Sequence, residues 1–171
     1  MGHNEQLRVE LEPNMDEAER LYPRVLARMT QLMREVDEHG DAGPASERAA
    51  EDIRRLTSKM VEPSELLYAW ESEGEEVVAF RLSLPDPPVV EDISFAELTT
   101  LVHRAMTHPV PTADGFAGSF GPYLDRWYAA LLRRNCTRYR PQLFNRRRSP
   151  GGDWYDPSAE EIATAISPRD S

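Results

Sequence analysis

Apolar residues recur at helical spacing in the first third of the chain. Between residues 22 and 36 they repeat at intervals of three and four, and Asn14 with Glu17 is typical of a helix N-cap and its capping-box partner. A second run with the same period covers residues 45–60. The pattern predicts an antiparallel helical hairpin over residues 14–60.

The period then changes from 3.6 to 2. Large apolar residues alternate with more polar ones from Leu66 to Trp70 and again from Val78 to Leu84. This alternation predicts a central antiparallel β-hairpin over residues 66–84, in which Tyr68 lies opposite Phe80 and the large apolar side chains share one face. The turn of this hairpin is acidic, and it is either a solvated loop or a recognition tip for a basic partner. The acidic tip consists of Glu71, Glu73, Glu75 and Glu76.

Helical signals return in residues 94–166. Ser94 begins a capping-box sequence, a loop rich in glycine and proline covers residues 109–121, and a further helix begins at Pro122. Asp156 is the expected cap of a last short helix. Because these elements do not alternate as βαβ units, the sequence predicts an α+β fold with two to three helices packed on the β-hairpin.

The length and composition are those of an ordinary globular protein. A chain of 171 residues with 40% hydrophobic and 29% charged residues suits a single domain over residues 1–171. No apolar run approaches the length of a membrane span, so no membrane association is expected. Cys136 is the single cysteine, which excludes an internal disulfide and favours the cytoplasm.

Charge is unevenly distributed along the chain. The net charge is −10, but residues 1–100 contain 23 acidic and 10 basic residues, whereas residues 101–171 contain 7 acidic and 10 basic ones. Nineteen of the 20 basic residues are arginines, which a coding bias toward arginine explains as well as selection does. Arginine count alone is therefore a weak indication of function.

A basic segment stands out against this acidic background. Residues 126–148 contain eight arginines and no acidic residue. The arginines of the helical part have local reasons, because cations are favoured near a helix C-terminus. The remainder, residues 138–148 with the nearby Trp154, is the predicted partner-binding or anion-binding site. Its residues are Arg138, Tyr139, Arg140, Phe144, Arg146, Arg147, Arg148 and Trp154.

The sequence contains no recognisable catalytic or metal-binding motif. His103 and His108 are five residues apart and so lie on different faces of a helix, which disfavours a shared metal ion. The glycines of residues 109–121 lack the lysine and hydroxyl residue of a phosphate-binding P-loop. We expect no cofactor.

Three functions remain open from the sequence. The first is a non-catalytic cytoplasmic interaction or regulatory protein, of adaptor, antitoxin or immunity type, that binds a protein partner through charged surfaces. The second is an anion or nucleic-acid binder that uses residues 126–148, although the net charge of −10 disfavours a polyanion. The third is a small enzyme whose site is not visible in the sequence. A homo-oligomer through the methionine-rich stripe of residues 14–39 is a further expectation.

Overall fold

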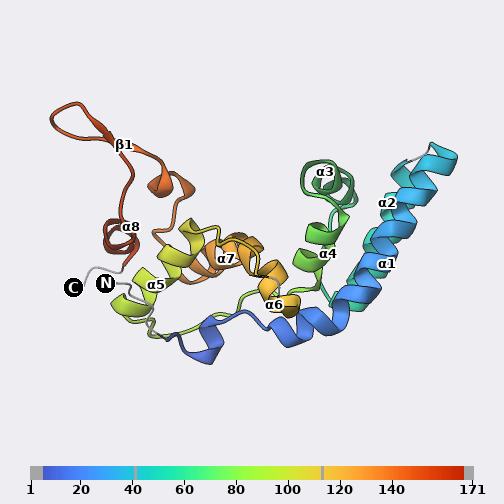
Figure 1. The fold of residues 1–171 in the computed structure, drawn as a ribbon, viewed down its shortest axis with the longest axis horizontal. Helices are drawn as coiled ribbons and strands as arrows, with labels where there is room; N and C mark the ends of the chain where they lie inside the picture. The colour runs from blue at the N-terminus through green and yellow to red at the C-terminus, as the bar shows by residue number, and fades with distance from the viewer. Residues whose placement is uncertain (1–5, 41, 113, 168–171) are drawn as a thin grey trace. The chain divides into compact units, whose positions relative to one another are not determined.

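The computed structural model describes residues 6–40, 42–112 and 114–167. Within these residues the chain is mostly helical, with eight α-helices and one two-stranded sheet (Figure 1). The predicted α+β fold with a central β-hairpin is therefore wrong. The described residues form two compact units: unit 1 is drawn from Met1–Glu12, Pro87–Thr112 and Gly121–Ser171, and unit 2 from Pro13–Asp86 and Ala113–Phe120. A single domain stays a prediction.

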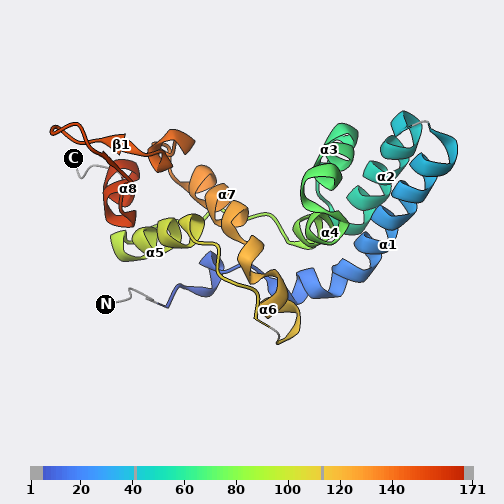
Figure 2. The same ribbon diagram turned by 45° about the horizontal axis from the view of Figure 1, so that its top comes forward.

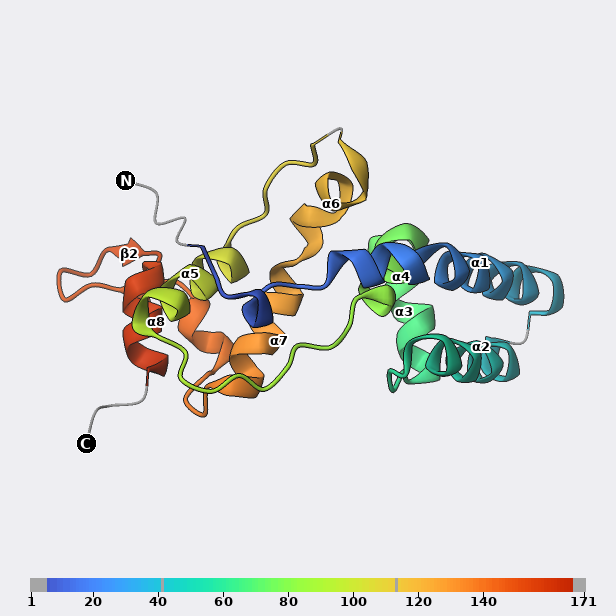
Figure 3. The same cartoon turned by 90° about the horizontal axis from the view of Figure 1, so that it is seen from below.

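Unit 2 is built on two long helices. α1 (Met15–His39) and α2 (Ala42–Thr57) lie side by side in the region of the predicted helical hairpin (Figure 3). The side chain of Asn14 accepts a hydrogen bond of 3.0 Å from the backbone N–H of Glu17, as expected of the N-cap. α2 ends three residues before Met60, whose side chain is 80% exposed rather than part of the apolar face.

The apolar stripe of α1 is buried inside unit 2. Met29 is fully buried and Met33 is 9% exposed, and α1 packs against both α2 and α4. The expectation of a homo-oligomer requires an apolar stripe that is wider than one helical hairpin can cover. Because α4 supplies the additional cover, that requirement no longer holds, and oligomerisation through residues 14–39 stays a prediction without structural support.

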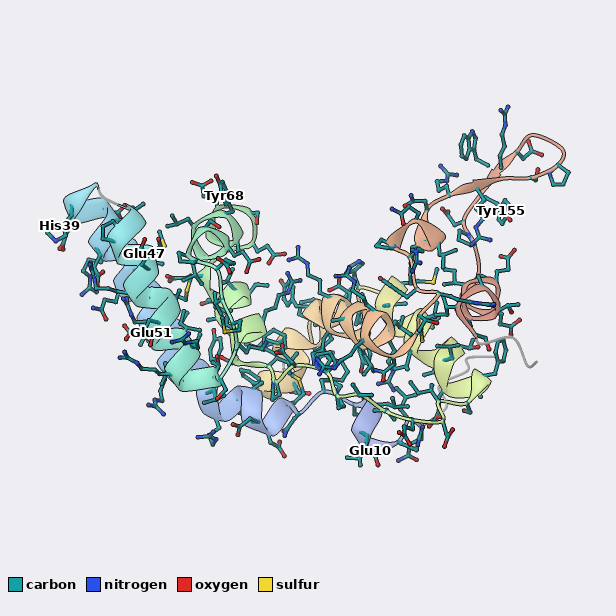
Figure 4. The ribbon with its side chains drawn as sticks, turned by 180° about the vertical axis from the view of Figure 1, so that it is seen from behind. Glu10, His39, Glu47, Glu51, Tyr68 and Tyr155 are labelled. Carbon is teal, nitrogen blue, oxygen red and sulfur yellow. The ribbon has the colours of Figure 1, made fainter. Side chains whose placement is uncertain are left out.

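The region predicted as the central β-hairpin is a pair of helices. These are α3 (Pro63–Glu73) and α4 (Glu75–Ser83). Gly74 separates them with a φ of 83°, a backbone conformation that glycine adopts without a steric penalty. Tyr68 is 73% exposed on the outer surface of α3 (Figure 4), whereas Phe80 is fully buried. Two residues predicted to share one face therefore lie in different environments.

The β-hairpin prediction failed because both apolar runs are short. An alternation over only four or five positions also fits a helix in which the intervening residues are partly buried. Periodicity alone does not distinguish a strand from a helix over so short a run. Helix start signals outweigh the alternation here: Pro63 is the first residue of α3, and Glu75 and Glu76 lie in the first turn of α4. The side chain of Trp70 lies outside what the structure describes.

Four aromatic rings pack together where α1, α4 and the segment after residue 114 meet. Tyr22 of α1 and Phe80 of α4 contact Phe116 and Phe120, with ring centroids 4.6–5.7 Å apart. Phe116 and Phe120 belong to α6 (Gly115–Phe120), which forms within the predicted loop of residues 109–121. Aromatic contacts of this geometry therefore attach a short segment of residues 109–121 to unit 2.

Unit 1 is a second group of helices. α5 (Phe95–Met106) contacts both α7 (Asp125–Asn135) and α8 (Ala159–Ile166), as Figure 2 shows. The capping box predicted at Ser94 is present, with both of its hydrogen bonds. α8 is capped by Ser158 rather than by Asp156, because the Ser158 side chain accepts from the N–H three residues ahead.

A polar network ties the N-terminal segment of unit 1 to its helices. A guanidinium N–H of Arg104 donates to the carboxylate of Glu12 at 2.6 Å and to the phenol oxygen of Tyr128 at 2.8 Å. The phenol in turn donates to Glu12 at 3.2 Å. Because Tyr128 is only 4% exposed, this network anchors the chain just before α1 to the core of unit 1.

The buried phenol of Tyr128 makes the free energy of unfolding depend on pH in the alkaline range. Burial raises the pKa of Tyr128 from 10.0 to about 12. A phenol with a higher pKa in the folded chain stabilises the fold below pH 10, and this contribution is lost as the pH rises toward 12. We expect the stability difference between wild type and Tyr128→Phe to shrink by about 2 kcal/mol between pH 9.5 and 11.5, measured by urea unfolding. A constant difference would contradict the burial of this hydroxyl.

Candidate functional site

The arginine-rich segment continues unit 1 after α7. It contains a 3₁₀ helix, η3 (Pro141–Phe144), followed by β1 (Arg147–Arg148) and β2 (Trp154–Tyr155). These two strands form the only sheet among the described residues. In Figures 1 and 2 the hairpin extends away from the helices of its own unit. We call residues 146–156 the arginine hairpin.

The connecting turn has a defined backbone. The N–H of Ser149 donates to the carbonyl of Asp153 at 2.8 Å, and the N–H of Gly152 donates to the carbonyl of Ser149 at 2.9 Å. Gly152 has a φ of 94°, which a residue with a Cβ rarely adopts. The Gly151-Gly152 pair therefore makes the turn, and the strands on either side pair in antiparallel register.

The register decides which side chains face the same way. Arg148 pairs with Trp154, and Arg147 pairs with Tyr155. Directly opposed residues share a face and alternate residues along a strand return to it, so Arg146, Arg148 and Trp154 lie on one face. Trp154 is 62% exposed, and the side chain of Arg146 is 64% exposed. We call these three residues the Arg–Trp face.

The five arginines of the predicted site differ in their contacts. Four donate to backbone carbonyl oxygens at 2.7–3.3 Å, and these are Arg138, Arg140, Arg147 and Arg148. Arg146 pairs with a carboxylate, at 3.3 Å from Nε to Oδ1 of Asp156. Because a carbonyl does not neutralise a guanidinium, the hairpin retains unbalanced positive charge. Residues 146–156 contain three arginines and two aspartates, a net charge of +1.

The aromatic residues of the predicted site divide into buried and exposed ones. Tyr139 is 7% exposed, and its ring lies 5.9 Å from that of the half-buried Phe144. Trp127, which lies within residues 126–148 and would be a stacking surface for nucleic acid if it were exposed, is 8% exposed. Trp127 and Tyr139 belong to the core of unit 1, and Phe144 packs beside Tyr139 at its margin. Trp154 is the aromatic residue of the predicted site that the fold leaves exposed. Tyr155, which is not among the predicted site residues, is 36% exposed (Figure 4).

The predicted acidic tip is the junction of α3 and α4. Glu73 pairs with Arg81 of α4, and Glu75 accepts a hydrogen bond of 3.2 Å from Thr30 of α1. Both carboxylates therefore have partners within unit 2. Glu71 and Glu76 are exposed.

The other candidate chemical groups do not assemble into a reactive site. His103 and His108 are exposed, whereas Cys136 is half-buried at the end of α7 and burial raises the pKa of its thiol. A thiol with a raised pKa is a poor nucleophile at neutral pH. The groove beside it, of about 420 Å³, is lined by Val90, Asp92, Ile93, Leu98, Asn135, Cys136, Thr137 and Ile166, and neither histidine is among them. The described residues contain no group of three or more metal-binding side chains.

The two units differ strongly in charge. The ranges that make up unit 2 contain 18 acidic and nine basic residues, a net charge of −9. Those of unit 1 contain 12 acidic and 11 basic residues, a net charge of −1. The acidic character of the chain therefore belongs to the unit that does not contain the arginine hairpin.

Comparisons with protein-family models, with curated proteins and with solved structures found no match. Within the described part of the chain, none of the helices combines the length and the apolar character that crossing a membrane requires.

Proposed function

We propose that the chain is a non-catalytic interaction protein whose Arg–Trp face binds an acidic surface of a protein partner. The observation that carries this proposal is an exposed tryptophan directly opposite an exposed arginine on a hairpin that extends from its unit. Tryptophan and arginine are the residues most enriched at the energetic centres of protein interfaces. A regulator or adaptor fits this arrangement, and the single cysteine favours a cytoplasmic location.

Charge supports an acidic partner. Arg148 hydrogen-bonds to the carbonyl of Gly152 and has no carboxylate within ion-pair distance among the described residues. An acidic group of a partner would supply the missing counter-charge, and a planar guanidinium binds a carboxylate through two parallel hydrogen bonds. The net charge of unit 2 is negative, so unit 2 should repel an acidic surface of the partner. This repulsion favours the hairpin as the place where the partner binds.

Binding of single-stranded nucleic acid is the second candidate. The net charge of −1 on unit 1 opposes a polyanion much less than the −10 of the whole chain does. A single exposed indole provides one stacking position, however, whereas proteins that bind single strands stack successive bases on several aromatic residues. Trp127 and Tyr139 are buried and Phe144 is half-buried, so these rings offer no further stacking positions for a single strand.

Affinity capture from an extract of the native host tests this proposal. Tagged wild-type protein and a Trp154→Ala/Arg148→Glu double variant are compared in nuclease-treated extract at low salt. We expect one or a few proteins that the wild type retains and the double variant loses. Equal recovery by both would show that the hairpin is not the binding site. Recovery of nucleic acid alone, from extract without nuclease, would favour the second candidate.

A further inference from the structure

The edges of the arginine hairpin are the feature that the proposed function leaves unexplained. A two-stranded sheet has two edges, and the backbone N–H and C=O groups that point outward from them have no neighbouring strand. Sheets of two short strands are marginally stable in water by themselves. Among the described residues β1 and β2 pair only with each other.

The alternation of bonded and non-bonded pairs in the β1–β2 ladder shows which backbone N–H and C=O groups point outward. Ser149 and Asp153 form a hydrogen-bonded pair, and bonded and non-bonded pairs alternate along an antiparallel ladder. The next pair, Arg148 with Trp154, is therefore a non-bonded pair whose N–H and C=O groups point away from each other. Arg146 directly precedes β1 and pairs with Asp156, and continuing the alternation by one residue would direct its backbone groups outward beside the edge of β1. Arg146 and Arg148 thus present both their backbone groups and their side chains together.

The two edges differ in charge. The edge of β1 carries Arg146 and Arg148, about 7 Å apart along the strand. The edge of β2 carries Trp154 and Asp156, and Pro157 follows directly without a backbone N–H to donate. An acidic strand therefore matches the edge of β1 and is repelled at the edge of β2.

We propose that the partner contributes an extended acidic segment that adds to the edge of β1 as an antiparallel third strand. This inference rests on the proposed function and specifies how the partner is recognised. The backbone of Arg146 and Arg148 supplies the hydrogen bonds, as in other cases of strand addition to an exposed sheet edge. Acidic side chains two residues apart on the added strand lie directly opposite the two guanidinium groups and on the same face.

A short peptide with alternating glutamates tests this geometry. The probe is fluorescein-labelled Thr-Glu-Val-Glu-Val-Thr, measured by anisotropy with the full chain at low salt. A residue opposite Arg146 or Arg148 in a bonded pair directs its own N–H toward β1. We therefore expect N-methylation of the two glutamate amides to weaken binding at least tenfold, and N-methylation of the two valine amides to change it less than threefold.

A variant of the protein provides an independent check. Asp156 pairs with Arg146 on the face that the acidic strand contacts. Asp156→Asn removes a competing carboxylate and should strengthen binding of the peptide about threefold, whereas Asp153→Asn, in the turn, should change it little. Both side chains belong to exposed residues, so neither change disturbs a core.

The outcomes separate this inference from the proposed function. Equal effects of the two N-methylated peptides, or no binding of the unmodified peptide at 1 mM, would overturn strand addition. The proposed function would still stand if the native partner required Trp154 and Arg148. If the wild-type chain bound neither the unmodified peptide nor any protein that requires Trp154 and Arg148, both strand addition and the proposed function would be overturned. A dT15 oligonucleotide that binds more tightly than the peptide would contradict the choice of an acidic protein segment.

Discussion

Phe80→Ala should lower the free energy of unfolding of unit 2 by about 3–5 kcal/mol. Phe80 is fully buried in α4, and its ring lies 4.6 Å from that of Phe120 in a stacked arrangement. Removing it leaves a cavity between α4 and α6 and takes away the aromatic contacts that attach α6. Urea unfolding followed by circular dichroism measures the change as a shift of the midpoint.

Tyr68→Ala is the matched control for Phe80→Ala. In the helical structure Tyr68 is 73% exposed, so its removal should change the free energy of unfolding by less than about 0.5 kcal/mol. In the β-hairpin that the alternation predicted, both residues would share the buried face and both changes would be severe. Similar large losses in the two variants would therefore contradict the helical assignment of α3.

Arg148→Glu should weaken binding of the captured protein partner at least 30-fold, or about 2 kcal/mol. The change replaces a guanidinium on the Arg–Trp face with a carboxylate, which repels the acidic surface that we propose as its ligand. The wild-type affinity should fall as salt is added from 50 to 300 mM, and that of the variant should depend on salt less steeply. Titration of the purified partner measures both effects.

Charge reversal at the α3–α4 junction provides the comparison. Glu76 is exposed in the first turn of α4, in the unit that does not contain the hairpin. Glu76→Arg should therefore alter the affinity for the partner less than threefold. If Glu76→Arg weakens binding as much as Arg148→Glu does, the acidic residues of unit 2 belong to the interface and the hairpin is not its centre.

The long helices were predictable because their signals are local and repeated. α1 carries its apolar stripe over 25 residues, and the capping box at Ser94 marks the start of α5. The apolar runs within residues 66–84 are short, and an alternation over so few positions is compatible with the period of a strand and with that of a helix. Packing of α4 between α1 and α6 decides the outcome, and packing of that kind is non-local.

The candidate site was predictable in composition but not in arrangement. Unbalanced charge identified the arginines, and the glycine pair between them and Trp154 is a recognised turn signal. Burial of Tyr139 and partial burial of Phe144 depend on the packing of this segment within unit 1, where η3 contacts α8, and no local pattern encodes that packing. The sharing of one face by Arg148 and Trp154 depends on register, which the turn conformation sets.

If the Arg–Trp face is the binding surface, removing its tryptophan should weaken binding far more than removing an exposed aromatic residue elsewhere. Trp154 and Tyr68 are both exposed aromatic residues, but they belong to different units. The dissociation constant of the captured partner is measured for Trp154→Ala and for Tyr68→Ala. We predict a loss of at least 30-fold for Trp154→Ala and less than threefold for Tyr68→Ala. Wild-type affinity in Trp154→Ala, or an equal loss in both variants, would contradict the claim.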